Sequence, residues 1–277
     1  MKFFFEKNIF RKYTTIVALV ASIVTFILSF LSFIEIDSFI IILILIIFLF
    51  VLVLTYPILL IFSKRFQKIS LIINQSDVEV SFGDIDFSSN GIIVINFNEY
   101  FDTLVDEKII SSQTLNGKFI TSHINNLKDF DEYIEEYIPE SFIIEKNITR
   151  KNGGKTTKYQ LGTMCYYKNY ALLAFSHFDC DNEANLTQMD YVICLLNMWK
   201  NLNIHYAQKE IFVPLMGLGI TRFKDIKIQP QELLRMLIWT FKISQKKFAE
   251  PSKVHILINN KLKNQMNLSE LKVFEDN

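Results

Sequence analysis

The chain has 277 residues, in which 29 Lys and Arg balance 29 Asp and Glu. Half of its residues are hydrophobic and its mean hydropathy is +0.23, which is high for a soluble protein. Residues 69–277 are mildly acidic, and basic groupings there are pairs such as Lys246-Lys247, which argues against polymeric nucleic acid as a partner. The cysteines and histidines show no metal-ligand spacing, so we expect no metal and no cofactor.

Two uncharged runs, residues 13–34 and 38–62, hold almost all of the hydrophobic excess. Each is long enough to cross a membrane, because a helix needs about 20 residues for this. The first run is too long for the apolar region of a cleaved signal peptide, and no small-residue cleavage site ends it. Since only residues 35–37 separate the runs, we expect a transmembrane helical hairpin in 1–68 and a cytoplasmic domain in 69–277.

Basic residues lie at the end of this hairpin that is opposite its turn. Lys2, Lys7, Arg11 and Lys12 precede the first run, and Lys64, Arg65 and Lys68 follow the second. Positively charged flanks of membrane helices remain in the cytoplasm. We therefore expect a multi-pass protein of the cell inner membrane with both termini and the domain in the cytoplasm.

After residue 68, short apolar runs alternate with longer amphipathic ones, which is typical of an α/β domain. Predicted strands cover residues 78–82, 92–96, 159–167, 171–177, 210–215 and 254–258, and predicted helices cover 129–137, 186–202 and 231–243. Lys168-Asn169 is expected to turn a hairpin, and residues 141–160 are expected to form an exposed excursion.

Three segments carry residues that suit a nucleotide: 81–85 (SFGDI), 92–103 with Asn98, and 212–220 with two glycines. Each alone also fits ordinary structure, as a turn, a helix cap or a loose loop. Together the three segments describe a site for a nucleotide diphosphate. A glycine-containing loop after a strand exposes backbone N–H groups that bind phosphate, an aspartate accepts a hydrogen bond from an adenine amino group, and an asparagine binds ribose hydroxyls.

The order and spacing of these segments resemble a macro domain, the fold that binds ADP-ribose at the ends of its central strands, over roughly residues 76–262. The resemblance implies a mixed β-sheet flanked by helices. It also implies site residues, namely Asp84 and Ile85 at the adenine, Asn98 at the distal ribose, and Gly217, Leu218, Gly219 and Ile220 at the phosphates.

With two membrane helices ahead of it, the run NEYFDT at 98–103 is similar to that of macro-domain effectors in Thoeris-type antiphage systems. That resemblance implies a signal nucleotide made by a TIR-domain partner enzyme, a histidine conjugate of ADP-ribose. It further implies abortive infection through damage to the host membrane. We expect contact with membrane lipid and formation of a homo-oligomer on activation.

Hydrolytic macro domains place a glycine run after the asparagine motif, whereas here Glu99, Tyr100, Phe101 and Asp102 follow Asn98. Tyr100 or Phe101 is expected either to stack on a ring of the ligand or to lie in the core, and Asp102 is a further ligand-binding candidate. We therefore predict a nucleotide reader rather than an enzyme.

An alternative is a membrane-tethered ADP-ribosyl hydrolase, in which Asp102, Asp106 or Glu107 acts as general base. A passive anchor that binds no nucleotide is a third hypothesis. Turnover of an ADP-ribosylated substrate distinguishes the hydrolase, and absence of binding distinguishes the anchor.

Overall fold

The computed structural model describes residues 7–31, 38–63, 67–179, 181–218 and 222–276. The chain divides into two compact units, Met1–Gln67 with Asn267–Glu270, and Lys68–Met266 with Leu271–Asn277. The second unit holds the α/β domain, and each unit is described separately below.

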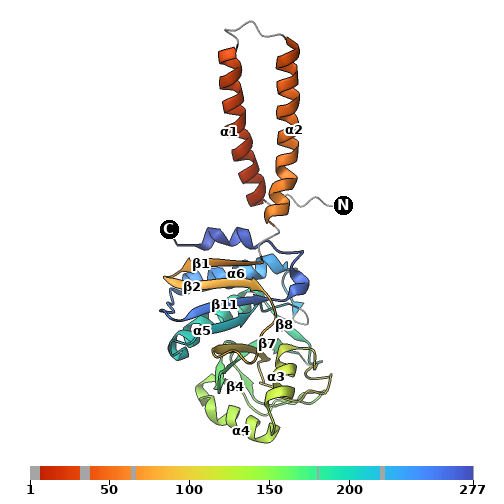
Figure 1. Ribbon diagram of the computed structural model, residues 1–277. Helices are drawn as coiled ribbons and strands as arrows, with labels where there is room; N and C mark the ends of the chain where they lie inside the picture. Colours follow the sequence, from red (N-terminus) through yellow and green to blue (C-terminus); the bar gives the residue numbers. More distant parts are fainter. Residues whose placement is uncertain (1–6, 32–37, 64–66, 180, 219–221, 277) are drawn as a thin grey trace. The chain divides into compact units, whose positions relative to one another are not determined.

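The first unit contains two long helices, α1 (Lys7–Leu31) and α2 (Ser38–Ser63), which contact each other (Figure 1). The hydroxyl of Tyr13 donates to the backbone oxygen of Leu52 at 3.3 Å, and its ring meets that of Tyr56 edge-on at 5.3 Å. Because Tyr13 lies near the start of α1 and Tyr56 near the end of α2, the helices run antiparallel. Pro57 lies inside α2.

The apolar character of α2 is continuous, and its stretch Ile42–Leu59 has a mean hydropathy of 3.1 over 18 residues, none of them buried. By length and composition this helix could span a membrane. In α1 the apolar stretch Tyr13–Ile27 is shorter. Two membrane spans thus remain a prediction, with stronger support for the second helix, and the turn expected at 35–37 lies outside the described residues.

The second unit is built on a mixed sheet whose order, within the described residues, is β1-β2-β11-β9-β3-β7-β8-β10, with β6 paired to β7. The strands are β1 (Lys68–Ile73), β2 (Ser76–Phe82), β3 (Ile92–Asn98), β6 (Met164–Tyr167), β7 (Tyr170–Phe178), β8 (Ala184–Leu186), β9 (Ile211–Pro214), β10 (Arg222–Phe223) and β11 (Lys253–Ile258). The central strands β2, β11, β9, β3 and β7 are parallel, while β1, β6 and β8 pair antiparallel with their neighbours β2 and β7. A separate pair joins β4 (Ile143–Glu145) to β5 (Lys158–Tyr159).

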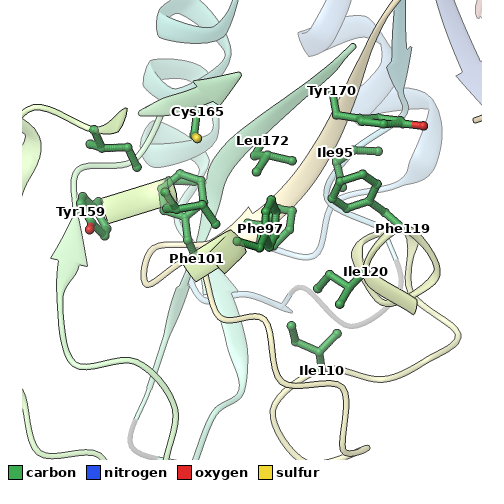
Figure 2. Close-up of a cluster of buried hydrophobic side chains, with 14 of the residues drawn as sticks. Ile95, Phe97, Phe101, Ile110, Phe119, Ile120, Tyr159, Cys165, Tyr170 and Leu172 are labelled. Carbon is green, nitrogen blue, oxygen red and sulfur yellow. The ribbon is translucent and has the colours of Figure 1, made fainter. Parts of the chain in front are cut away.

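Helices cover both faces of this sheet (Figure 1). They are α3 (Leu115–His123), α4 (Leu127–Tyr137), α5 (Gln188–His205) and α6 (Pro230–Ser244), with short 3-10 helices at Glu140–Phe142, Asn260–Leu262 and Leu268–Phe274. On one face, Phe119 of α3 packs into a buried cluster with Phe97 of β3 (Figure 2). Phe130 of α4 belongs to the same cluster. On the other face, Tyr191 of α5 meets Phe175 of β7, with ring centroids 5.8 Å apart.

The interface between α5 and α6 shows how a buried polar group is satisfied. Trp199 is fully buried and its ring lies 4.8 Å from that of Phe241, while its indole N–H donates to the hydroxyl of Thr240 at 3.2 Å. Burial of a large side chain contributes about 1.5–3 kcal/mol, and the hydrogen bond removes the penalty that an unpaired N–H would impose. This interface therefore holds the two helices in a defined register.

The expected mixed sheet flanked by helices is confirmed, and so are five of the predicted strands and the three predicted helices within a few residues. The strand predicted at 159–167 is wrong. It is two strands, β5 and β6, because the chain turns at Gly162, whose φ is +86°. The predicted hairpin turn at Lys168-Asn169 is confirmed by the pairing of Tyr167 with Tyr170.

Candidate functional site

A cavity of about 540 Å³ lies in the second unit, where four parallel strands end. Its lining includes residues at the ends of β3, β7 and β9, the loop after β11, and the start of α3. Ligands of open α/β sheets bind outside the carboxyl ends of the strands, and small-molecule sites occupy roughly 300–1,000 Å³. The position and size of this cavity therefore make it the candidate binding site.

Asn98, the last residue of β3, lines the cavity and is only 3% exposed. Its side-chain oxygen accepts from the backbone N–H groups of Tyr100 at 3.0 Å and Asp102 at 3.3 Å, and its amide nitrogen donates to the Asp102 carboxylate at 2.9 Å. An asparagine amide has two N–H donors. The turn after β3 is thus built on the Asn98 side chain, with one of its donors committed to Asp102.

Asp102 lies under this turn in a buried ion pair, with side-chain exposures of 1% for Asp102 and 4% for Arg150. Nη1 of Arg150 reaches both carboxylate oxygens, at 2.9 and 2.7 Å, and the backbone N–H of Lys155 donates at 2.7 Å. The carboxylate is surrounded by protein donors and is not part of the cavity lining. Direct contact of Asp102 with a ligand stays a prediction, and in the structure its carboxylate is occupied by protein donors.

Tyr100 and Phe101 also lie within the protein. Tyr100 is 5% exposed, burial raises its pKa, and the Arg150 guanidinium lies 4.2 Å from its ring centroid. Phe101 is fully buried between Phe97 and Tyr159, with centroids 5.9 and 5.5 Å away (Figure 2). Of the two alternatives for these rings, the placement agrees with a position in the core and gives neither ring a face in the cavity lining.

Asp84 is exposed, follows β2, and is not itself among the residues that line the cavity. One of its carboxylate oxygens accepts from the side-chain amide of Asn259, a lining residue, at 3.1 Å. The backbone N–H of Gly83 donates to the oxygen of Ile258 at 2.9 Å, so the ends of β2 and β11 are held together. Ile85 is half-buried and packs against the buried cluster that contains Phe97 and Phe119.

The loop after β9 supplies Gly217 and Leu218 to the lining. Gly217 has φ of +83°, and a Cβ there would lie 3.3 Å from the rings of Phe223 and Tyr191. The hydroxyl of Tyr191 donates to the backbone oxygen of Met216 at 3.3 Å, which fixes the start of this loop. The other two residues expected here, Gly219 and Ile220, lie outside the described residues.

Comparisons with known proteins identify the family of the chain. Residues 78–259 match the family described as Thoeris protein ThsA, Macro domain. The chain belongs to the Thoeris ThsA macro-domain family. A curated relative, Thoeris protein ThsA of Bacillus amyloliquefaciens (strain Y2), is 40% identical over 274 residues, which cover 97% of this chain and 90% of the relative. A solved structure, a mutant of the Oceanobacillus iheyensis macrodomain, is 14% identical to this chain, with a TM-score of 0.44. The match covers 75% of this chain and 96% of the macrodomain chain.

Membership of the ThsA family confirms the resemblance drawn from the motifs and places the chain among macro-domain proteins of Thoeris antiphage defence. The match spans all three motif segments, from within β2 to the loop after β11.

The two other carboxylates considered as general bases in this ThsA-family chain are turned toward backbone. Asp106 accepts from the N–H groups of Ile109 and Lys108, at 2.7 and 2.9 Å, and these hydrogen bonds lower its pKa. Hydrogen bonds from Ser112 likewise lower the pKa of Glu107. A lowered pKa weakens a carboxylate as a base, and neither residue lines the cavity.

Several lining residues were not predicted, among them Asn96 in β3, Ser176 and Phe178 in β7, and Asn259 and Lys261 after β11. The strands that carry or precede them were predicted, and the rule that ligands bind at carboxyl ends of parallel strands points to these positions. The missing information was the strand order, which places β11 and β7 on either side of β9 and β3.

Proposed function

We propose that this protein is a membrane-anchored effector of antiphage defence that binds an ADP-ribose-derived nucleotide in the cavity at the ends of β3, β7, β9 and β11. The observation that carries the proposal is the cavity itself, about 540 Å³ at the strand ends of a macro-domain family member. Its lining brings together Asn98, Gly217 and Leu218. Asp84 is linked to it through Asn259.

Each part of the nucleotide has a matching group. The adenine amino group would donate to Asp84, the diphosphate would accept from backbone N–H groups of the loop at Gly217 and Leu218, and the distal ribose would meet Asn98. We take the signal to be a histidine conjugate of ADP-ribose made by a TIR-domain partner enzyme.

A reader is favoured over a hydrolase by the state of the nearby carboxylates. Asp102 is ion-paired with Arg150 and accepts two further hydrogen bonds. Asp106 and Glu107 have lowered pKa values and are bound to backbone. A general base must reach the proton that it removes, and these three groups are committed elsewhere.

The proposed output is damage to the host inner membrane by the hairpin of α1 and α2, with both termini in the cytoplasm and several copies acting together. Support comes from the apolar stretch Ile42–Leu59. A ligand shifts such an equilibrium only by binding the active arrangement more tightly. The nucleotide must therefore bind the membrane-damaging assembly better than the resting one.

Binding and turnover are tested together on the full-length protein in lipid nanodiscs. Calorimetry is run with ADP-ribose, its histidine conjugate and AMP, and each mixture is then analysed by chromatography. The proposal expects stoichiometric binding of the conjugate and its recovery unchanged. Conversion of the nucleotide, lost on Asp106→Asn or Glu107→Gln, would establish the hydrolase instead.

The membrane output is tested in cells that supply the signal, by dye-reported membrane potential. Full-length protein should depolarise the membrane, whereas residues 68–277, which lack both helices, should bind the nucleotide without depolarisation. Equal depolarisation by the shortened chain would refute a role for the hairpin.

A further inference from the structure

Arg150 is a buried cation near the cavity, and it lies outside the three motif segments of the sequence. Arg150 lies in the segment between β4 and β5, and its side chain is 4% exposed. Its guanidinium is packed against the ring of Tyr100, 4.2 Å from the centroid. The backbone passes close to this guanidinium at Gly154, which has φ of +107° and where a Cβ would collide with the Arg150 side chain.

The Arg150 guanidinium joins three stretches of chain that are distant in sequence. Nη1 contacts both oxygens of Asp102, after β3, and donates to the backbone oxygen of Lys155 at 3.1 Å. Nη2 donates to the side-chain oxygen of Asn182, between β7 and β8, at 2.6 Å. Arginine suits this role because its planar group presents several donors in fixed directions.

Two of these stretches support walls of the cavity. Asp102 shares its Oδ2 between Arg150 at 2.7 Å and the amide of Asn98, a lining residue, at 2.9 Å. Asn182 lies between Phe178 and Ala184, which also line the cavity. Arg150 itself is not part of the lining, so any effect on a ligand acts through these neighbours.

We propose that Arg150 is a positioning residue for the nucleotide site: through Asp102 it fixes the direction in which the Asn98 amide faces the ligand, and through Asn182 it positions the neighbouring β7–β8 segment that carries Phe178 and Ala184. This rests on the proposed function, because it assigns to Arg150 control over affinity for the ribose end of the nucleotide. A buried ion pair is weak evidence of stability, since apolar residues of similar volume often serve as well. The geometric role is therefore the one that the hydrogen bonds support.

The test compares Arg150→Met with a matched control, Lys151→Met, in the full-length protein in nanodiscs. Lys151 is the next residue along, is 74% exposed, and pairs with Asp181 of the same β7–β8 loop at 3.3 Å. Calorimetry with ADP-ribose is carried out well below the melting temperature of each variant. We expect Arg150→Met to weaken binding about tenfold or more and Lys151→Met to leave it within about twofold, as expected of an exposed ion pair.

Coupling to Asn98 separates positioning from general destabilisation. If Arg150 acts through Asn98, then adding Arg150→Met to Asn98→Ala should cost much less affinity than it does in the wild type. Losses that multiply in the double variant, or unchanged affinity in Arg150→Met, would overturn the proposal. If Arg150→Met does not fold, Arg150→Lys replaces it, because an ammonium group can pair with Asp102 but does not reproduce the fork that also holds Asn182.

A measurement without nucleotide keeps this proposal separate from the proposed function. In protein labelled with ¹⁵N at asparagine, the side-chain amide signals of Asn98 and Asn182 should shift in Arg150→Met and Arg150→Lys but not in Lys151→Met. Unshifted signals would refute the positioning role even if nucleotide binds. Shifted signals in a protein that binds no ADP-ribose compound would confirm the positioning of Asn98 while refuting the proposed function.

Discussion

Replacing Asp84 by alanine separates nucleotide recognition from folding. The side chain is exposed and makes one hydrogen bond, at 3.1 Å to Asn259, so its loss should cost folding about 1 kcal/mol or less. For a domain of this size that lowers the melting temperature by no more than about 2–4 °C. A charge-assisted hydrogen bond to an adenine amino group contributes about 1.5–3 kcal/mol, so affinity should fall roughly 10- to 150-fold.

Asp86 provides the matched control, because it is an exposed aspartate two residues further along. Its carboxylate accepts from the backbone and hydroxyl of Ser88, at 2.9 and 2.7 Å, whereas Asp84 accepts from the lining residue Asn259; neither aspartate itself lines the cavity. Calorimetric affinity for ADP-ribose and thermal melting are measured for Asp84→Ala, Asp86→Ala and the wild type. Equal affinities in all three would show that Asp84 is only a turn residue, and a matching loss in Asp86→Ala would show that the effect is nonspecific.

Two further predictions rest on the geometry of the second unit, and a third rests on the charges that flank the hydrophobic runs. Gly217→Ala forces a side chain into a backbone with φ of +83°, so chemical denaturation should show a loss of about 1–2 kcal/mol together with weaker nucleotide binding; unchanged stability would contradict the described loop. Burial of Glu79 opposes its ionisation, yet hydrogen bonds and charge from Lys253 and Lys68 lower its pKa from the ordinary 4.5. Its contribution to stability is thus present above that value and lost as pH falls below it, and melting of Glu79→Gln across this range should depend less on pH than melting of the wild type. A reporter fused after Asn277 should behave as cytoplasmic, and periplasmic activity would overturn the orientation.

Secondary structure was predictable wherever a single pattern decided it. The strand at 92–96 is a short continuous apolar run, and the helix at 231–243 has apolar periodicity and a proline just before it. Helix α3 was missed because its sequence, LNGKFITSH, contains glycine and β-branched residues that disfavour helix. It forms nonetheless, since Thr114 caps its first turn and Phe119 and Ile120 are buried against the sheet.

The site was predictable in its motifs and less so in their surroundings. Asn98 and Gly217 line the cavity, whereas Asp84 and Ile85 do not, and their contact with a ligand stays a prediction. The burial of Asp102 in an ion pair could not be predicted, because its partner Arg150 lies 48 residues further along the chain and no local sequence pattern indicates such a pairing. Tyr100 could be assigned to ligand or core only once that cation was found over its ring.

The Asp102–Arg150 pair also constrains how this sequence can diverge. Losing either partner alone would leave an uncompensated buried charge, which costs about 3–5 kcal/mol and is a large part of the stability of a typical domain. Descendants of this chain should therefore keep both residues or exchange both in close succession. In an alignment of close relatives the two positions should covary, together with the glycine at 154, whose backbone makes room for the guanidinium. A relative with a neutral residue at 102 is then expected to lack the arginine at 150 and to accept a side chain at 154.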